Sequence, residues 1–233
     1  MKKIYSFIGS RSTNGHTEFL AKQILEKISE EQEVDWEINT FNDITIDPYG
    51  KVTEEDGLEI LKNKILNCDI LLLGCPVYMH GIPGELKNAI DRLSDWAHTM
   101  RFRGKKVILV STCSGNGHTT AIDTLHSYVL KFGGTVAGKI VTADNIPDIY
   151  DRDDIIMSLN NQINLNITQM INDIAIELDK PFRTNNFLES SFQIYKANYS
   201  KYIKEGWKTE ETDYWIQSGM INCQSFQEWV DKK

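Results

Sequence analysis

Hydroxyl side chains gather in one short segment near the amino terminus, the first loop (residues 10–17). It reads Ser-Arg-Ser-Thr-Asn-Gly-His-Thr and precedes a helical pattern of apolar residues that includes Phe19, Leu20 and Ile24. The first N–H groups of a helix have no acceptor inside it, and the helix dipole adds partial positive charge there. A phosphate group therefore suits this loop, although Ser and Thr in this position also fit simple helix capping.

The first loop lacks the common glycine-rich phosphate motifs. Neither G-x-G-x-x-G nor G-x-x-x-x-G-K-[ST] occurs there. Hydroxyl groups stand where those motifs have glycines, which favours a terminal phosphate monoester over a buried pyrophosphate.

Two further loops have residue types that suit a planar ligand. The second loop (76–84) reads Pro-Val-Tyr-Met-His-Gly-Ile-Pro-Gly, and the third loop (112–118) reads Thr-Cys-Ser-Gly-Asn-Gly-His. Proline fixes the path of the chain, glycine lets the backbone approach a ligand closely, and Tyr78 offers a ring face for stacking. Either loop alone is also compatible with an ordinary strand-to-helix turn.

The elements that must position these loops follow from apolar periodicity. Apolar runs predict strands at residues 3–8, 34–41, 69–75, 105–112 and 135–142. The remaining patterns predict helices at residues 16–31, 54–66, 84–98, 118–132 and 152–179, the last ended by Pro181. Strict alternation of strands and helices predicts a parallel sheet with helices on both faces. Ligands of such sheets bind beyond the carboxyl ends of the strands, so the loops are expected to share one edge.

The last part of the chain has a different composition, and we place a domain boundary after residue 180. Residues 181–233 are rich in aromatic side chains, and Phe192, Tyr195, Tyr199 and Tyr202 recur at helical spacing. We expect a helical extension that packs on the core or on a partner subunit. An alternative makes Trp207, Tyr214 and Trp215 the walls of a pocket for a second substrate.

Bulk composition excludes several classes of protein. The 233 residues carry a net charge of −8, which argues against nucleic acid as a main partner. No apolar run approaches the roughly 20 residues that span a membrane, and no signal peptide is evident, so we expect a cytoplasmic protein. The four cysteines form no C-x-x-C pair, so no metal site is expected.

Three sequence blocks carry a resemblance to a known family. They are G-S-R-S-x-x-G-x-T at residues 9–17, C-P-V-Y-M-x-G-I-P-G-x-L-K-N-x-I-D-R at residues 75–92 and S-G-N-G at residues 114–117. Together they resemble the flavodoxin-like NAD(P)H-dependent FMN reductases over about residues 1–145. The resemblance implies an α/β fold, a doubly wound five-stranded parallel sheet of order 2-1-3-4-5, here with the C-terminal helical extension, and a homodimer.

The resemblance also implies a set of cofactor-binding residues. The FMN phosphate would be held by Ser10, Arg11, Ser12, Thr13, Gly15, His16 and Thr17, although Arg11 also suits a phosphate of the nicotinamide cofactor. One edge of the flavin ring would be wrapped by Pro76, Val77, Tyr78, Met79, His80 and Gly81. The other side would be approached by Thr112, Ser114, Gly115 and Gly117. No side chain is assigned to catalysis, and Lys87, Asn88, Asp91 and Arg92 are expected to brace the helix and loop or a dimer contact.

The expected activity is hydride transfer from NAD(P)H through bound FMN to an acceptor. A quinone, a nitro or azo compound, free flavin or an activated double bond all remain possible acceptors. The alternatives are a flavodoxin-type electron carrier without its own NAD(P)H site, a flavin-binding interaction protein, and a tailoring reductase of dehydroamino acids in a modified peptide. Some members carry an iron–sulfur cluster on a cysteine-rich insertion, but residues 42–50 here contain no cysteine.

Overall fold

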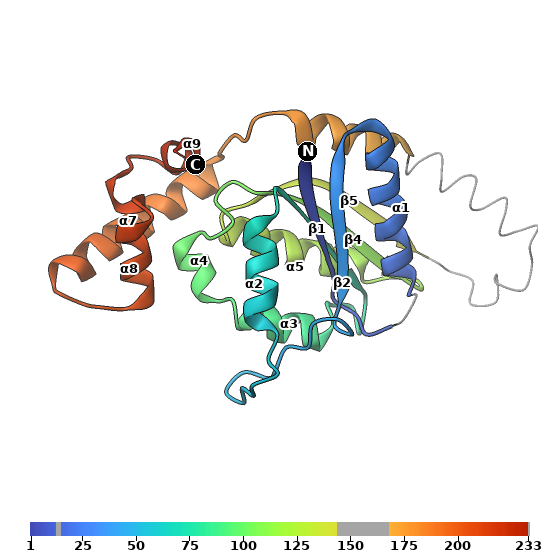
Figure 1. The fold of residues 1–233 in the computed structure, drawn as a ribbon, viewed down its shortest axis with the longest axis horizontal. Coiled ribbons are helices and arrows are strands. Elements are labelled where there is room, and N and C mark those ends of the chain that lie inside the picture. Colours follow the sequence, from blue (N-terminus) through green and yellow to red (C-terminus); the bar gives the residue numbers. More distant parts are fainter. Residues whose placement is uncertain (13–14, 144–167, 233) are drawn as a thin grey trace, which may run out of the picture.

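The centre of the molecule is a parallel sheet of five strands in the order β2-β1-β3-β4-β5 (Figure 1). The computed structural model describes residues 1–12, 15–143 and 168–232. The strands are β1 (Lys2–Ile8), β2 (Val34–Thr40), β3 (Ile70–Pro76), β4 (Lys106–Cys113) and β5 (Thr135–Ala143). Each boundary lies within one residue of the prediction, and the predicted strand order is confirmed.

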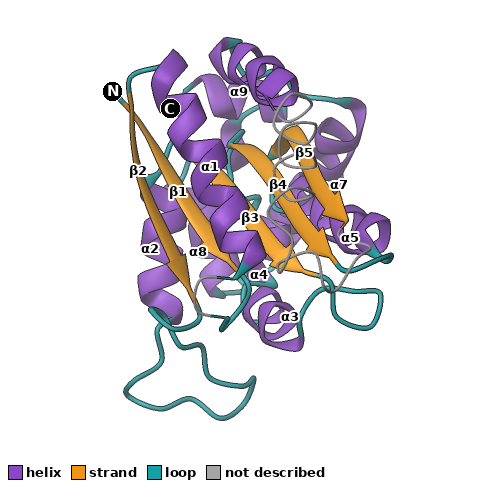
Figure 2. Ribbon diagram, turned by 90° about the vertical axis from the view of Figure 1, so that its right-hand side faces the viewer, coloured by secondary structure: helices purple, strands orange, loops and turns teal. Residues whose placement is uncertain are grey.

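Helices cover both faces of the sheet because the central strands are apolar on both sides (Figure 2). Along β1, Ile4 and Ile8 pack against α1 (His16–Glu31) and helical residues 168–179. Tyr5 and Phe7 point to the opposite face. That face is covered by α2 (Leu58–Asn67), α3 (Gly84–Asp91), α4 (Asp95–Thr99) and α5 (His118–Lys131).

Some helical predictions differ from the structure. The predicted helix 84–98 is divided into α3 and α4. Between them, the amides of Leu93 and Ser94 donate to carbonyls three residues back, at 3.0 and 3.2 Å, which is a tighter turn than an α-helix makes. The helix predicted from residue 54 begins at Leu58, because the Gly57 amide donates to the Thr45 carbonyl. Residues 152–167 of the last predicted helix lie outside the described residues.

The C-terminal extension is helical, as predicted, and has a hydrophobic cluster of its own. It comprises α7 (Asn186–Lys204), α8 (Glu210–Gln217), η2 (Met220–Asn222) and α9 (Phe226–Asp231). Phe192, Trp215, Phe226 and Trp229 are buried together, and Met100 at the end of α4 joins them. In Figure 1 the extension lies to one side of the sheet, with α7 beside α5 and α8 beside α4.

The extension is attached to the turn that follows α4. The Arg101 guanidinium lies 3.7 Å from the centre of the Tyr214 ring. Arg103 Nη2 donates to the Trp229 carbonyl at 2.8 Å, and Trp215 Nε1 donates to the His98 carbonyl at 3.1 Å. The extension therefore packs on its own chain's sheet domain. Within the described residues, no helix is both long enough and apolar enough to cross a membrane.

Candidate active site

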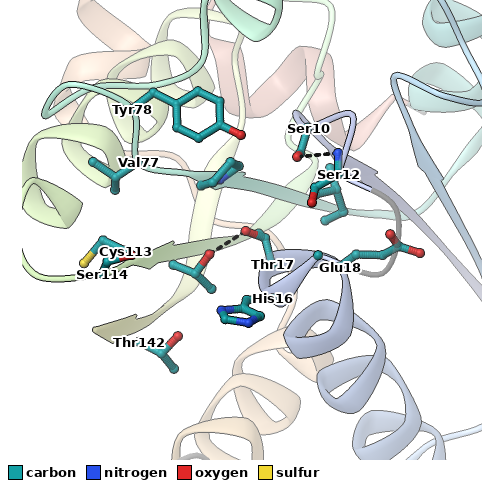
Figure 3. Close-up of a pocket in the computed structure, with 14 residues that line it drawn as sticks. Ser10, Ser12, His16, Thr17, Glu18, Val77, Tyr78, Cys113, Ser114 and Thr142 are labelled. Carbon is teal, nitrogen blue, oxygen red and sulfur yellow. Dashed lines mark hydrogen bonds between the residues drawn. The ribbon is translucent and has the colours of Figure 1, made fainter. Parts of the chain in front are cut away.

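A cleft of about 350 Å³ lies at the carboxyl ends of the central strands, where the three loops meet (Figure 3). Its volume falls within the range of roughly 300–1,000 Å³ that is usual for small-molecule sites. The lining residues come from the ends of β1, β3, β4 and β5, from the start of α1, and from the three loops. They are Ile8, Ser10, Ser12, Gly15, His16, Thr17, Glu18, Pro76, Val77, Tyr78, Thr112, Cys113, Ser114 and Thr142.

One end of the cleft is built from hydroxyl groups and the start of α1. The Ser12 amide donates to Ser10 Oγ at 3.0 Å, which folds the first loop back on itself. Thr17 Oγ1 and Thr112 Oγ1 lie 2.6 Å apart, so a hydrogen bond links α1 to the end of β4. Thr17 is only 3% exposed. Figure 3 shows the hydroxyl groups of Ser10, Ser12 and Thr17 on the same side of the cleft as the first turn of α1.

This end of the cleft suits an anion although the described residues that line it include neither Lys nor Arg. Glu18 contributes a carboxylate to the lining. The N–H groups of the first helical turn, which have no acceptor within the helix, and the helix dipole supply positive potential there. Neutral donors of this kind bind phosphate groups at many helix N-termini.

The second loop makes a tight turn beside the other end of the cleft. The amides of Tyr78 and Gly81 each donate to the other residue's carbonyl at 3.0 Å. Met79 and His80, at the two central positions, have φ values of 46° and 62°. Residues other than glycine adopt such values at a cost of about 1–3 kcal/mol each, and they cluster at functional sites. Tyr78 lines the cleft, whereas the Met79 side chain is 96% exposed.

The third loop packs directly against the second at Gly117. This residue has φ of +88°, and an added Cβ atom would lie 2.8 Å from both Val77 Cγ1 and His80 Cα. Only glycine fits both the backbone conformation and the space. Nearby, Cys113 Sγ lies 3.5 Å from His118 Nδ1 at the start of α5.

Most predicted site residues line the cleft together. Those that do not line it are Arg11, Met79, His80, Gly81, Gly115 and Gly117, although Gly117 shapes it by packing. Thr13 lies outside the described residues. Trp215 is wholly buried and Tyr214 is covered by Arg101, so neither lines the cleft.

Four lining residues were missed by the sequence reasoning: Ile8, Glu18, Cys113 and Thr142. Each had a positional signal, because Ile8, Cys113 and Thr142 lie at or next to the carboxyl end of a strand. Glu18 follows the last predicted phosphate-binding residue by one position. The apolar, acidic and thiol character of Ile8, Glu18 and Cys113 hid them from a search for phosphate ligands, whereas Thr142 was taken only as the last residue of a predicted strand.

The residues expected to brace the second loop do hold a neighbouring segment. Asn88 Nδ2 donates to the Asp47 carbonyl at 2.9 Å. Arg92 forms an ion pair of 2.7 Å with Asp56, and the two side chains are 10% and 9% exposed. Burial opposes ionisation of Asp56, but hydrogen bonds from Arg92 and from the Asp47 amide outweigh it and lower the pKa of Asp56. Lys87 pairs with Asp91 along α3.

Among the residues that the structure describes, no three His, Cys, Asp or Glu side chains are grouped so that they could hold a metal ion. Cys68, Cys75 and Cys223 are buried and Cys113 is half-buried, all as free thiols.

Comparison with protein families places the cleft in a known context. The model of the NADPH-dependent FMN reductase family matches residues 2–148. An iron–sulfur flavoprotein of Methanocaldococcus jannaschii is 26% identical over 159 residues, which are 64% of this chain and 79% of that protein. An FMN-dependent NADH:quinone oxidoreductase of Pseudomonas syringae pv. tomato is 34% identical over 87 residues, which are 34% of this chain. The match spans only 43% of that oxidoreductase.

Solved structures share the fold at low sequence identity. An NADH:FMN oxidoreductase in its apo form has a TM-score of 0.58 at 17% identity, covering 78% of this chain and 92% of its own. RosB with a bound 8-demethyl-8-formylriboflavin-5'-phosphate also has a TM-score of 0.58, at 14% identity, covering 89% of this chain and 88% of its own. At these identities the likeness concerns the fold alone.

Proposed function

Because this chain belongs to the NADPH-dependent FMN reductase family, we propose that it passes a hydride from NAD(P)H through bound FMN to a small acceptor. The observation that carries the proposal is the convergence of three loops on one cleft. Hydrogen-bond donors suited to a phosphate lie at one end, and two rigid loops lie at the other.

The described residues fit FMN on their chemistry. Ser10, Ser12 and Thr17, with the first turn of α1, would bind the terminal phosphate. Val77 and Tyr78 from the second loop and Ser114 from the third would hold the ring system. Bound FMN would supply the hydride-accepting and hydride-donating chemistry.

The chain's own contribution is binding and orientation. The hydroxyl groups and the start of α1 would hold the phosphate, and the second and third loops would position the ring end. The turn at residues 78–81 and the contact at Gly117 make that end rigid. A flavin ring held in one orientation would lower the entropy that is lost when the nicotinamide ring binds against it.

We also propose a homodimer in the cytoplasm. Met79 and Phe19 are exposed apolar side chains, one beside the cleft and one in the first turn of α1, and a second subunit that covers them would enclose the cleft. Sedimentation equilibrium tests this proposal, and a monomer at micromolar concentration would contradict it.

The proposed activity is tested on purified protein. Loading with FMN should give a visible flavin spectrum, and anaerobic addition of NADH or NADPH should bleach it stoichiometrically without a separate reductase. A quinone should then restore the colour. Protein that binds FMN but is bleached only when a separate reductase is added would instead be an electron carrier. Protein that does not bind FMN would refute the proposal.

The Thr17→Val and Ser29→Ala variants provide a matched pair for the same test. Thr17 lines the cleft, whereas Ser29 lies near the far end of α1 and donates to the Leu25 carbonyl. FMN binding should weaken in the first variant and remain normal in the second. Equal effects of the two variants would argue against this cleft as the FMN site.

A further inference from the structure

The Arg11 side chain leaves the cleft although its neighbours in the first loop line it. Arg11 Nε donates to Glu85 Oε1 at 2.7 Å, and Arg11 Nη1 donates to the Phe41 carbonyl at 3.0 Å. Both acceptors lie outside the cleft lining. The guanidinium is thus held by a carboxylate and a carbonyl, which are the groups a phosphate would have to replace.

The backbone around Arg11 is held by the segment that follows β2. Asn42 Nδ2 donates to the Arg11 carbonyl at 3.0 Å, and the Phe41 amide donates to the Ser10 carbonyl at 3.2 Å. Together with the Nη1 bond, these contacts join the first loop to residues 41–42 through both side chain and backbone.

The partner Glu85 belongs to the element that ends the second loop. It lies in the first turn of α3, where a carboxylate is favoured by the helix dipole. The next residue, Leu86, packs closely on the start of the first loop, because a Cβ atom added at Gly9 would lie 2.6 Å from Leu86 Cδ2. The ion pair therefore spans a contact between the phosphate end of the site and the helix that anchors the ring end.

We propose that Arg11 is a positioning residue that joins the first loop to the start of α3, and that it does not bind a phosphate. The inference rests on the proposed function, because the two loops it joins are taken to hold the two ends of FMN. It replaces the expectation that Arg11 contacts the flavin or nicotinamide phosphate. The ion pair is about half exposed, at 45% and 50% for its two side chains, so its effect on affinity is modest.

Comparing FMN with riboflavin tests the proposal, because riboflavin has the same ring without the phosphate. Dissociation constants are measured by quenching of flavin fluorescence for the wild type and for Arg11→Met. A positioning role weakens both flavins by the same factor, about two- to fivefold. A selective loss of FMN affinity, or no loss for either flavin, would overturn it. Thr17→Val serves as a reference that should lose FMN selectively.

Glu85→Gln tests the same contact from its other side. A positioning role predicts that it weakens both flavins as Arg11→Met does, and that the double variant is no worse than either single one. If the released Arg11 instead reaches the phosphate, Glu85→Gln will strengthen FMN binding relative to riboflavin, which refutes the proposal. Thermal unfolding of each variant checks that the fold is retained.

The NADPH-to-NADH ratio of kcat/KM supplies a further readout. The 2′-phosphate of NADPH distinguishes the two donors, so a positioning role leaves the ratio unchanged in Arg11→Met. A selective loss with NADPH would assign Arg11 to that phosphate and overturn the proposal. Wild-type protein that binds no flavin refutes the proposed function itself, whereas these selective losses refute only the role of Arg11.

Discussion

Gly117 is the position where adding a single methyl group should disturb the packing of the site most. Its φ of +88° disfavours any side chain, and an added Cβ atom would lie 2.8 Å from Val77 Cγ1 and from the backbone Cα of His80. A backbone atom cannot rotate away as a side-chain tip can. Gly117→Ala should therefore separate the second and third loops.

The expected cost has two parts, and a matched control separates them. Gly206 has φ of +79° with no atom within 4 Å of an added Cβ, so Gly206→Ala carries the backbone term alone. That term is about 1–2 kcal/mol, and we expect the close contact at Gly117 to add about 1–3 kcal/mol. Since 1 kcal/mol shifts the Tm of a domain of this size by about 2–4 °C, Gly117→Ala should lower Tm several degrees more than Gly206→Ala.

Two measurements check this prediction. Thermal unfolding followed by circular dichroism gives the difference in Tm, and fluorescence titration gives the affinity for FMN. Gly117→Ala should weaken FMN binding, and Gly206→Ala, which lies in the extension, should not. Equal Tm shifts with normal FMN affinity in both variants would refute the close packing of the two loops.

Further predictions concern the phosphate end, the braced segment and the extension. Thr17→Val should weaken FMN binding about ten- to 150-fold, from the loss of about 1.5–3 kcal/mol for a hydrogen bond to a charged group; an unchanged titration would contradict this. Arg92→Met should lower the free energy of unfolding in urea by about 3 kcal/mol, because it leaves the carboxylate of Asp56 buried and unpaired, and a normal urea midpoint would exclude this. The folded pKa of Asp56 lies below its usual 3.8, so its contribution to stability is complete above pH 3.8 and is lost as pH falls through the folded pKa. Asp56→Asn should remove that part of the loss of stability in acid. If the urea midpoint depends on pH in the variant as it does in the wild type, Asp56 is not the group responsible. Trp215→Ala should destabilise the protein by about 3–5 kcal/mol while FMN affinity stays normal; weakened FMN binding would mean that the extension supports the cleft.

The sheet could be predicted almost to the residue because its strands carry a local signal. Residues on both faces of β1 and β4 are buried, so each strand reads as a continuous apolar run. The alternation of these runs with helical patterns then leaves few topologies. The division of the predicted helix 84–98 carries no such signal, because neither proline nor glycine marks the turn at Leu93 and Ser94.

The site was predictable as far as it follows strand ends. Ser10, Tyr78 and Thr112 follow or end three different strands, and parallel strands bring those ends to one edge. Cys113 lies between the predicted residues Thr112 and Ser114 but was passed over, because residue type was weighed above position and a thiol is not a typical phosphate ligand. Its contact with His118 appears only once α5 is placed.

By itself, the amino-acid sequence determined the sheet, the three loops and the family, since all of these rest on patterns within a few residues of one another. Only the tertiary structure decided which way side chains point. Arg11 turns to Glu85, 74 positions away along the chain, and Trp215 is buried beneath α4 where it cannot line the cleft. The physical reason is that packing between distant segments determines which group a side chain contacts. Local periodicity in the sequence does not encode such contacts.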